Sequence, residues 1–118
     1  MVEKIGVDIV QNKRIKLRLA FLRKVLSEHE LQMLDQFVSK RQKQEFVSGR
    51  WAVKEAIIKT LTVKETMHKL DIGYQANGAP VIKNPEYAHI LISISHEKKY
   101  SVGIALNQTY NQRSIPHY

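Results

Sequence analysis

Residues 41–62 contain an apolar side chain at nearly every turn of a helix. Phe46, Val53, Ile57 and Leu61 recur at helical spacing, no proline interrupts the stretch, and Gly49 is its one glycine. The pattern predicts one long helix over this range.

Before this helix, the chain predicts a strand and two short helices. Residues 2–10 alternate branched side chains with Gly6 and Asp8, which is the period-two pattern of a strand. Residues 14–38 predict two short helices with a break near Ser27, because the run Ser27-Glu28-His29-Glu30 has the pattern of a capping box.

After the helix, the pattern changes to period two and predicts strands at 70–75, 80–83, 89–95 and 100–106. Asn77-Gly78 between the first two runs is a strong hairpin signal. We therefore expect one α+β domain over residues 1–106, with an N-terminal strand, short helices, one long helix and an antiparallel β meander. Residues 107–118 are polar and predict a loose C-terminal tail.

The charge balance restricts the class of partner. The chain has 118 residues, with 19 Lys and Arg against 11 Asp and Glu, and a formal net charge of +8 at pH 7. Such a field attracts nucleic acid, phosphorylated cofactors, acidic proteins or a membrane surface, and charge alone does not choose among them. The absence of cysteine excludes disulfides and thiolate metal sites.

The N-terminal residues and the small size add two expectations. Charged residues interrupt the first ten positions, so we expect no signal peptide or membrane segment and a cytoplasmic location. A domain of this size has difficulty enclosing a deep cleft by itself, so a second copy is expected to supply another wall.

The long helix places charges in an unusual position. Arg50 and Lys54 project on its apolar side at i, i+4, where like charges cost about 0.2–0.5 kcal/mol in an isolated helix. A bound phosphate between them would relieve this repulsion, although geometry alone favours two side chains that extend past the core to water. Glu55 and Lys59 project from the other side as an i, i+4 ion pair, which is ordinary on a solvated face.

Two further residues could carry chemistry. Asp8 lies in an apolar strand, so it either faces water or holds a ligand. If this strand packs beside the long helix, Asp8 can meet Glu55, and two carboxylates with open positions suit a Mg2+ ion that bridges phosphates. His96 lies at the end of a predicted strand, a position where it could either contact a ligand or have a purely structural role.

Residues 13–24 carry six cations among apolar side chains. They predict a basic amphipathic helix for an acidic partner, a nucleic-acid backbone or a membrane surface, with a solvated face as the plain alternative. The nucleic-acid interpretation lacks support, because neither an RNP-type aromatic strand pair nor a zinc-finger spacing is present.

Taken in order, four motifs resemble the holo-acyl-carrier-protein synthase family, the small 4'-phosphopantetheinyl transferases. They are GVDIV at 6–10 followed by Arg14 and Ile15, FVSGRWAVKEA at 46–56 with Lys59, NGAP at 77–80, and SISH at 93–96. The long-helix motif is specific and the first motif is short. Gln11 and Asn12 depart from the family, which usually has an acidic and then an apolar residue there.

The resemblance implies transfer of the 4'-phosphopantetheine group of coenzyme A to a serine of apo acyl carrier protein in fatty acid biosynthesis, giving holo acyl carrier protein and 3',5'-ADP. It implies that Asp8 and Glu55 hold Mg2+, and that both act in catalysis with Lys59. The base stays open between direct deprotonation by Glu55 and a metal-bound water that Glu55 orients. Coenzyme A contacts are implied at Arg50, Lys54, Lys59, Gly78, Pro80, Ser95 and His96.

The resemblance also implies an assembly and a docking surface. The family is typically a homotrimer with active sites between subunits, which agrees with the size argument. Neither nucleic acid nor membrane is an expected partner. The implied docking residues for the acyl carrier protein are Arg14, Arg18, Phe21, Arg23 and Lys24.

Overall fold

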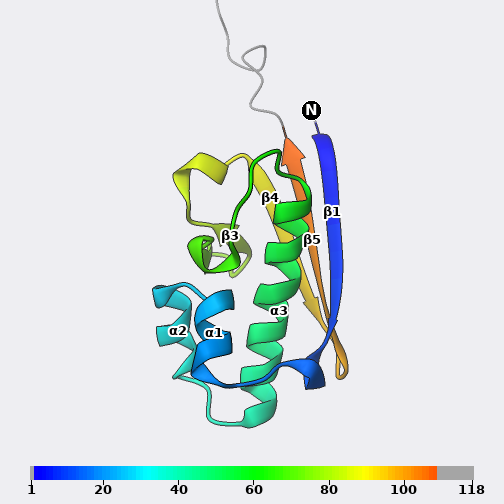
Figure 1. Ribbon diagram of the computed structural model, residues 1–118. Coiled ribbons are helices and arrows are strands. Elements are labelled where there is room, and N and C mark those ends of the chain that lie inside the picture. Colours follow the sequence, from blue (N-terminus) through cyan, green and yellow to red (C-terminus); the bar gives the residue numbers. More distant parts are fainter. Residues whose placement is uncertain (1, 109–118) are drawn as a thin grey trace, which may run out of the picture.

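A computed structural model describes residues 2–108 and confirms the predicted α+β fold class. The long helix α3 (Lys40–Lys59) lies across a three-stranded antiparallel sheet, as Figure 1 shows. The strands are β1 (Val2–Gln11), β5 (Tyr100–Gln108) and β4 (Ile90–His96), in that spatial order. The N-terminal strand therefore pairs with the last strand, and β1 and β4 form the two edges.

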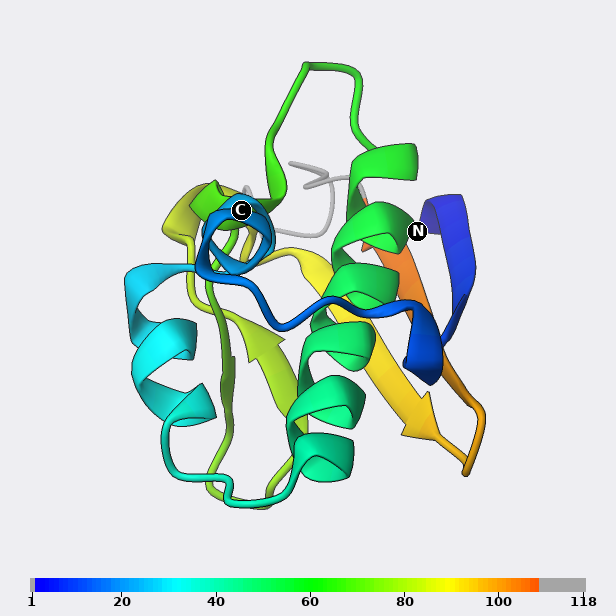
Figure 2. The same cartoon turned by 60° about the horizontal axis from the view of Figure 1, so that its bottom comes forward.

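Two short helices and a small hairpin complete the domain. The helices α1 (Leu19–Val25) and α2 (Glu28–Leu34) lie beside α3, while β2 (Ile72–Tyr74) and β3 (Pro80–Ile82) form a separate two-stranded sheet (Figures 1 and 2). Short 3-10 helices occur at Asn12–Arg14, Met67–Lys69 and Pro85–Tyr87. Within residues 2–108, no helix is long and apolar enough to cross a membrane.

Three details differ from the sequence predictions. The late strands divide into two sheets and do not form one continuous meander. Residues 13–24 are not one helix, because the chain runs through a 3-10 turn and an extended stretch with Ile15 buried before α1 begins after Arg18. Strand β5 continues to Gln108, and the rest of the predicted tail, 109–118, lies outside the described residues.

The backbone of helix α3 packs directly against the backbone of β1 and β5 at two glycines. A Cβ atom at Gly6 would lie 2.0 Å from the carbonyl oxygen of Ala56, and one at Gly103 would lie 2.3 Å from the backbone nitrogen of Val53. Only glycine fits such close approaches. Two glycines on neighbouring strands therefore fix how near the helix lies to β1 and β5.

This contact decides which face of β1 points inward. Gly6 and Asp8 face the helix, so the alternate side chains point away from it. Ile5, Val7 and Ile9 are 69%, 54% and 61% exposed. These three branched side chains thus lie on the outer face of the sheet, whereas an alternating strand usually turns its apolar side chains inward.

The core has two parts, which pack against different stretches of α3. One part joins α3 to the sheet and the β2–β3 hairpin through Val53, Ile57, Leu70, Ile72 and Ile90. The other joins α3 to α1 and α2 through Leu22, Val25, Leu34, Phe46 and Val47. Because α1, α2 and β2 contact the same side of α3 as its charged residues at 50 and 54, these residues are buried as well.

The partner of these two cations is Glu30, which is fully buried. Its Oε1 atom accepts a hydrogen bond from Lys54 Nζ, and its Oε2 atom accepts one from the backbone nitrogen of Ile72 at 2.9 Å and lies 3.7 Å from Arg50 Nε. Both interpretations from the sequence are therefore wrong: the side chains of Arg50 and Lys54 do not extend to water, and the anion between them is not an external phosphate. The protein supplies the anion itself.

Glu30 also belongs to the predicted capping box, which the structure confirms. The Ser27 hydroxyl accepts from the Glu30 backbone nitrogen at 3.2 Å, and Ser27 nitrogen donates to Glu30 Oε1 at 2.9 Å. Burial lowers the pKa of Lys54, while the adjacent carboxylate of Glu30 opposes that shift. One carboxylate thereby connects α2, α3 and β2.

We predict that Glu30→Ala lowers the free energy of unfolding by about 3–5 kcal/mol, because two buried cations lose their counter-ion. Chemical denaturation measures this loss. Glu28→Ala is the matched control, since Glu28 is exposed in the same turn of α2. Replacing Glu30 and Lys54 together with Leu should recover part of the loss. A Glu30→Ala protein as stable as the Glu28→Ala control would contradict this account of the cluster.

Candidate active site

A cavity of about 390 Å3 opens beside the β1 edge, between β1, α1 and α3. Asp8 and Glu55 both line it, so the structure brings together the two carboxylates that the sequence proposed as metal ligands. The full lining consists of Asp8, Ile9, Val10, Arg14, Ile15, Phe21, Trp51 and Glu55. This cavity is called the β1 cavity below.

The glycine contact between helix and strand explains why these carboxylates share a cavity. Asp8 follows Gly6 on the same face of β1, and Glu55 precedes Ala56, whose carbonyl lies nearest to Gly6. Asp8 pairs with Gly103 of β5, the second close contact with α3. The carboxylates therefore lie next to the points of closest contact between strand and helix, and both line the β1 cavity.

Lys59 extends toward β1 from the next turn of α3. Its Nζ atom donates to the carbonyl oxygen of Val7 at 2.9 Å and lies 3.6 Å from Asp8 Oδ1. The predicted ion pair of Lys59 with Glu55 is therefore wrong, and within residues 2–108 its ionic partner is Asp8. The Lys59 side chain is 51% exposed, which leaves its ammonium group accessible to an anion.

The β1 cavity suits a cation that needs few protein ligands. Within the described part of the chain, no group of three or more His, Cys, Asp or Glu residues could hold a metal ion. Asp8 and Glu55 supply two carboxylates, and Mg2+ is commonly held by one or two carboxylates together with waters and substrate phosphates. The donor set fits Mg2+ bound together with a phosphorylated substrate.

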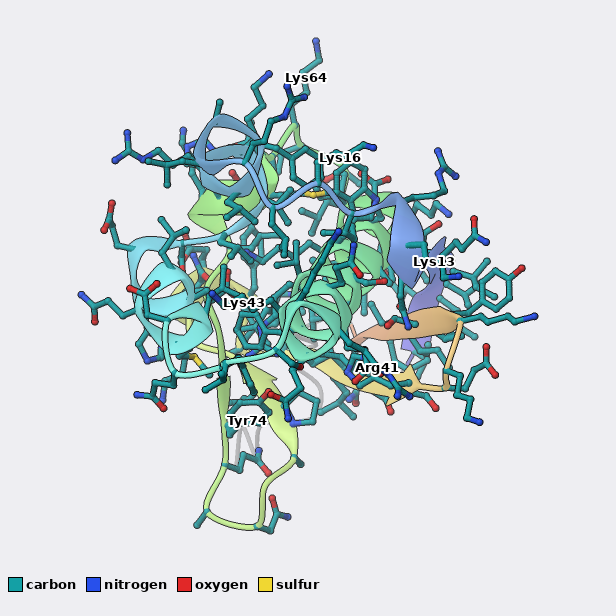
Figure 3. The ribbon with its side chains drawn as sticks, turned by 90° about the horizontal axis from the view of Figure 1, so that it is seen from below. Lys13, Lys16, Arg41, Lys43, Lys64 and Tyr74 are labelled. Carbon is teal, nitrogen blue, oxygen red and sulfur yellow. The ribbon has the colours of Figure 1, made fainter. Side chains whose placement is uncertain are left out.

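A second cavity, of about 260 Å3, lies beside β4, the opposite edge of the sheet. Its lining residues, which define the β4 cavity, are Phe37, Gln42, Glu45, Phe46, Arg50, Tyr74 and His96. The Arg50 guanidinium lies 4.2 Å from the Phe46 ring centroid and donates to the Tyr74 hydroxyl at 2.9 Å. Tyr74 lies at the base of the projecting β2–β3 hairpin in Figure 3.

His96 ends β4, as the sequence predicted, and borders this second cavity. A Cβ atom at Gly49 would lie 2.5 Å from His96 Cε1, so a glycine on α3 leaves room for the ring. On its other side, Nδ1 lies 2.8 Å from the Ser101 hydroxyl. Partial burial lowers the pKa of His96, Glu45 opposes this shift and Arg50 adds to it, so the net effect favours the neutral ring.

The structure separates the remaining residues that were proposed to contact coenzyme A. Lys54 is fully buried against Glu30 and lines neither cavity, so its proposed contact with a phosphate is not available in this structure. Gly78 has a φ of +87° and occupies the turn between β2 and β3, which explains the glycine without a ligand. Pro80 and the exposed Ser95 also lie outside both cavities.

Two of the five proposed docking residues line the β1 cavity, and the other three are exposed nearby in the chain. Arg14 and Phe21 line it directly, and the Phe21 ring stacks on Trp51 with centroids 5.4 Å apart. Arg18, Arg23 and Lys24 are exposed on and next to α1. A basic surface therefore leads to the carboxylates.

Sequence reasoning missed several residues at these sites. Tyr74 and Glu45 line the β4 cavity, but neither lies in a motif that marked it. Asn12 is only 4% exposed, and its Nδ2 atom donates to the carbonyl oxygens of Glu97 and Lys98. The sequence could have marked Asn12, because it is one of the two residues that depart from the family pattern.

Comparisons with known proteins agree with this fold. Residues 4–105 match the model of the 4'-phosphopantetheinyl transferase superfamily. The chain is 57% identical over 112 residues to the holo-[acyl-carrier-protein] synthase of Mycoplasma mycoides subsp. mycoides, covering 95% of this chain and 100% of that one. It is 36% identical over 114 residues to the synthase of Thermodesulfovibrio yellowstonii, covering 90% and 98%.

A solved structure is similar over most of its length. It is a holo-(acyl-carrier-protein) synthase from Bacillus anthracis in complex with CoA (3',5'-ADP). The similarity has a TM-score of 0.80 at 27% identity, and it covers 90% of this chain and 96% of the other.

Proposed function

Because the chain belongs to the 4'-phosphopantetheinyl transferase superfamily, we propose that it transfers the 4'-phosphopantetheine group of coenzyme A to a serine of apo acyl carrier protein. The products are holo acyl carrier protein and 3',5'-ADP. The names of its relatives and the CoA-bound Bacillus anthracis protein support both substrates. The observation that carries the proposal is the cavity that Asp8 and Glu55 share, with Lys59 beside Asp8. A cytoplasmic role in fatty acid biosynthesis is part of the same proposal.

Asp8 and Glu55 are the proposed ligands of Mg2+. Both line the β1 cavity, and two carboxylates leave positions for water and phosphate oxygens. When bound there, Mg2+ would neutralise the charge of the pyrophosphate of coenzyme A.

The protein's own part in the reaction is positioning and charge neutralisation. The serine oxygen forms a bond to the β-phosphorus of coenzyme A, the bond from that phosphorus to the leaving phosphate oxygen breaks, and the serine proton leaves to a base. No covalent enzyme intermediate is required. Lys59, with its exposed ammonium group, would contact the pyrophosphate as charge moves to the leaving 3',5'-ADP.

Glu55 is the proposed source of the base function. It acts either by accepting the serine proton directly or by orienting a water that accepts it. Both routes need its carboxylate in the β1 cavity, where the structure has it.

The proposed assembly is a homotrimer in which each active site lies between two copies. The β1 cavity and the β4 cavity border opposite edges of one sheet, so the residues proposed to bind coenzyme A are divided within a single copy. A neighbour that brings its β4 edge to the β1 edge of the first copy would join Asp8 and Glu55 to Arg50 and His96.

The outer face of the sheet supports this assembly. Val7 pairs with Ile104, and Leu106 pairs with both Ile5 and Leu91, so their side chains lie on one face. Ile5, Val7, Leu91 and Ile104 are each at least 39% exposed. Contiguous apolar surface of this kind marks an interface in soluble proteins.

The test of the activity is a mass spectrum of apo acyl carrier protein after incubation with coenzyme A and Mg2+. We expect the wild type to add the phosphopantetheine mass, and Asp8→Asn and Glu55→Gln each to slow transfer by about 100-fold or more. The exposed Asp35, changed to Asn, is the matched control and should transfer normally. Undiminished transfer in excess chelator would overturn the metal site, and an inactive wild type would overturn the function.

The assembly prediction concerns the outer face of the sheet. Val7→Glu should convert the trimer to monomers in sedimentation and abolish transfer, because a buried carboxylate at the interface has no partner. Val38→Glu is the matched control, since Val38 is 93% exposed and lies outside the sheet. A wild-type protein that sediments as a fully active monomer would refute the assembly.

The docking prediction uses Arg18 and Arg23, which are exposed and line neither cavity. Changing both to Glu should raise the apparent KM for the acidic carrier protein and flatten its salt dependence, because surface charge mainly accelerates encounter. The KM for coenzyme A should not change. Lys64→Glu with Lys69→Glu makes the same change in net charge elsewhere and should have little effect. Equal effects of the two double variants on the carrier protein would reject this docking surface.

A further inference from the structure

Three side chains form a continuous path from the end of β1 to the β4 cavity. The Ser101 hydroxyl lies 2.9 Å from Asn12 Oδ1 and 2.8 Å from His96 Nδ1. Asn12 and Ser101 are 4% and 0% exposed, so water has little access to the bond between them, whereas His96 lies at the exposed end of the path. The positions of the donors and acceptors in this path determine where the proton of His96 resides.

The orientation of the Asn12 amide is fixed by backbone. Its Nδ2 atom lies 3.2 Å from the carbonyl oxygen of Glu97 and 3.4 Å from that of Lys98. Carbonyl oxygens only accept, so the NH2 group has to face them, and the opposite orientation would place Oδ1 against two acceptors. The Asn12 Oδ1 atom therefore faces Ser101 as an acceptor.

The hydroxyl of Ser101 transmits this direction to His96. It has one proton, which it donates to Asn12 Oδ1, so toward the imidazole it can only accept. His96 Nδ1 must then carry a proton and donate it to Ser101 Oγ. A neutral imidazole has a single N–H, and Nε2 is consequently left with its lone pair.

We propose that Asn12 and Ser101 are positioning residues that hold neutral His96 in its Nδ1-protonated tautomer, with Nε2 available as an acceptor at the β4 cavity. A histidine ring in water prefers the other tautomer, so the buried path reverses the intrinsic preference. The departure of Asn12 from the family pattern thereby acquires a specific role.

The surroundings of the ring support this assignment. Glu45 and Arg50 of α3 are the charged groups whose fields act on His96, with opposite signs. The lowered pKa of His96 favours the neutral ring, and only a neutral ring has two tautomers. Gly49 allows the ring to lie against α3.

The tautomer determines what His96 can bind. A ligand N–H or O–H can donate directly to Nε2, whereas a phosphate oxygen can bind at that nitrogen only after the ring takes up a proton. This consequence for coenzyme A rests on the proposed function. The tautomer itself does not, because it is a property of the protein without substrates.

The experiment is a long-range 1H–15N correlation spectrum of the histidine rings at pH 8, without coenzyme A or carrier protein. The chain has five histidines, and a His96→Gln variant identifies the signals of His96. We expect wild-type His96 to have a protonated Nδ1 and an unprotonated Nε2. Ser101→Ala should shift the population to the Nε2-protonated tautomer, and Ser101→Thr, which keeps the hydroxyl, should restore it.

Ser93→Ala deletes the same hydroxyl on the outer face of the sheet and should leave His96 unchanged. Asn12→Leu should act like Ser101→Ala, but Asn12 also binds the turn after β4, so Ser101→Ala carries the test alone if Asn12→Leu does not fold. An Nε2-protonated His96 in the wild type, or an unchanged tautomer in Ser101→Ala, would overturn the proposal. Failure of the transfer assay would refute the proposed function and leave this result standing.

Discussion

The backbone contact between α3 and two glycines is the constraint on which the rest of the structure depends. Gly6 and Gly103 leave no space for a side chain between the strands and the helix. Asp8 follows Gly6 on the same face of β1, and Glu55 precedes the residue that Gly6 touches, so the close contact brings both carboxylates to one cavity. A looser packing of helix on sheet would separate them.

The packing of α3 has two unfavourable consequences, exposed apolar side chains and buried cations, and the protein offsets each in a different way. Because Gly6 and Asp8 face inward, Ile5, Val7 and Ile9 face outward and form an apolar surface, which the proposed assembly would bury. The packing of α1, α2 and β2 against α3 buries Arg50 and Lys54, and the buried carboxylate of Glu30 balances them. The acidic cavity and the exposed apolar face are thus consequences of one packing arrangement.

Local patterns predicted the elements well, because periodicity and capping depend on neighbouring residues. The strand expected at 2–10 is Val2–Gln11, the helix expected at 41–62 is Lys40–Lys59, and the break at Ser27 is a capping box. Ion pairs between distant residues could not be predicted in this way. The pattern identified Glu30 as part of a helix cap, but its ionic partner Lys54 lies 24 residues away in the sequence. The period-two pattern of β1 predicted two faces but not which of them contacts α3, because the close packing at Gly6 determines the inward face.

In the proposed assembly, each active site combines the β1 cavity of one copy with the β4 cavity of the next. Mixing two inactive variants under conditions of subunit exchange, Asp8→Ala and His96→Ala, tests it most directly, with transfer to the carrier protein as the readout. We expect the mixture to regain activity beyond the sum of its components, because some interfaces join an intact Asp8 to an intact His96. Mixed assemblies that form but remain inactive would contradict it.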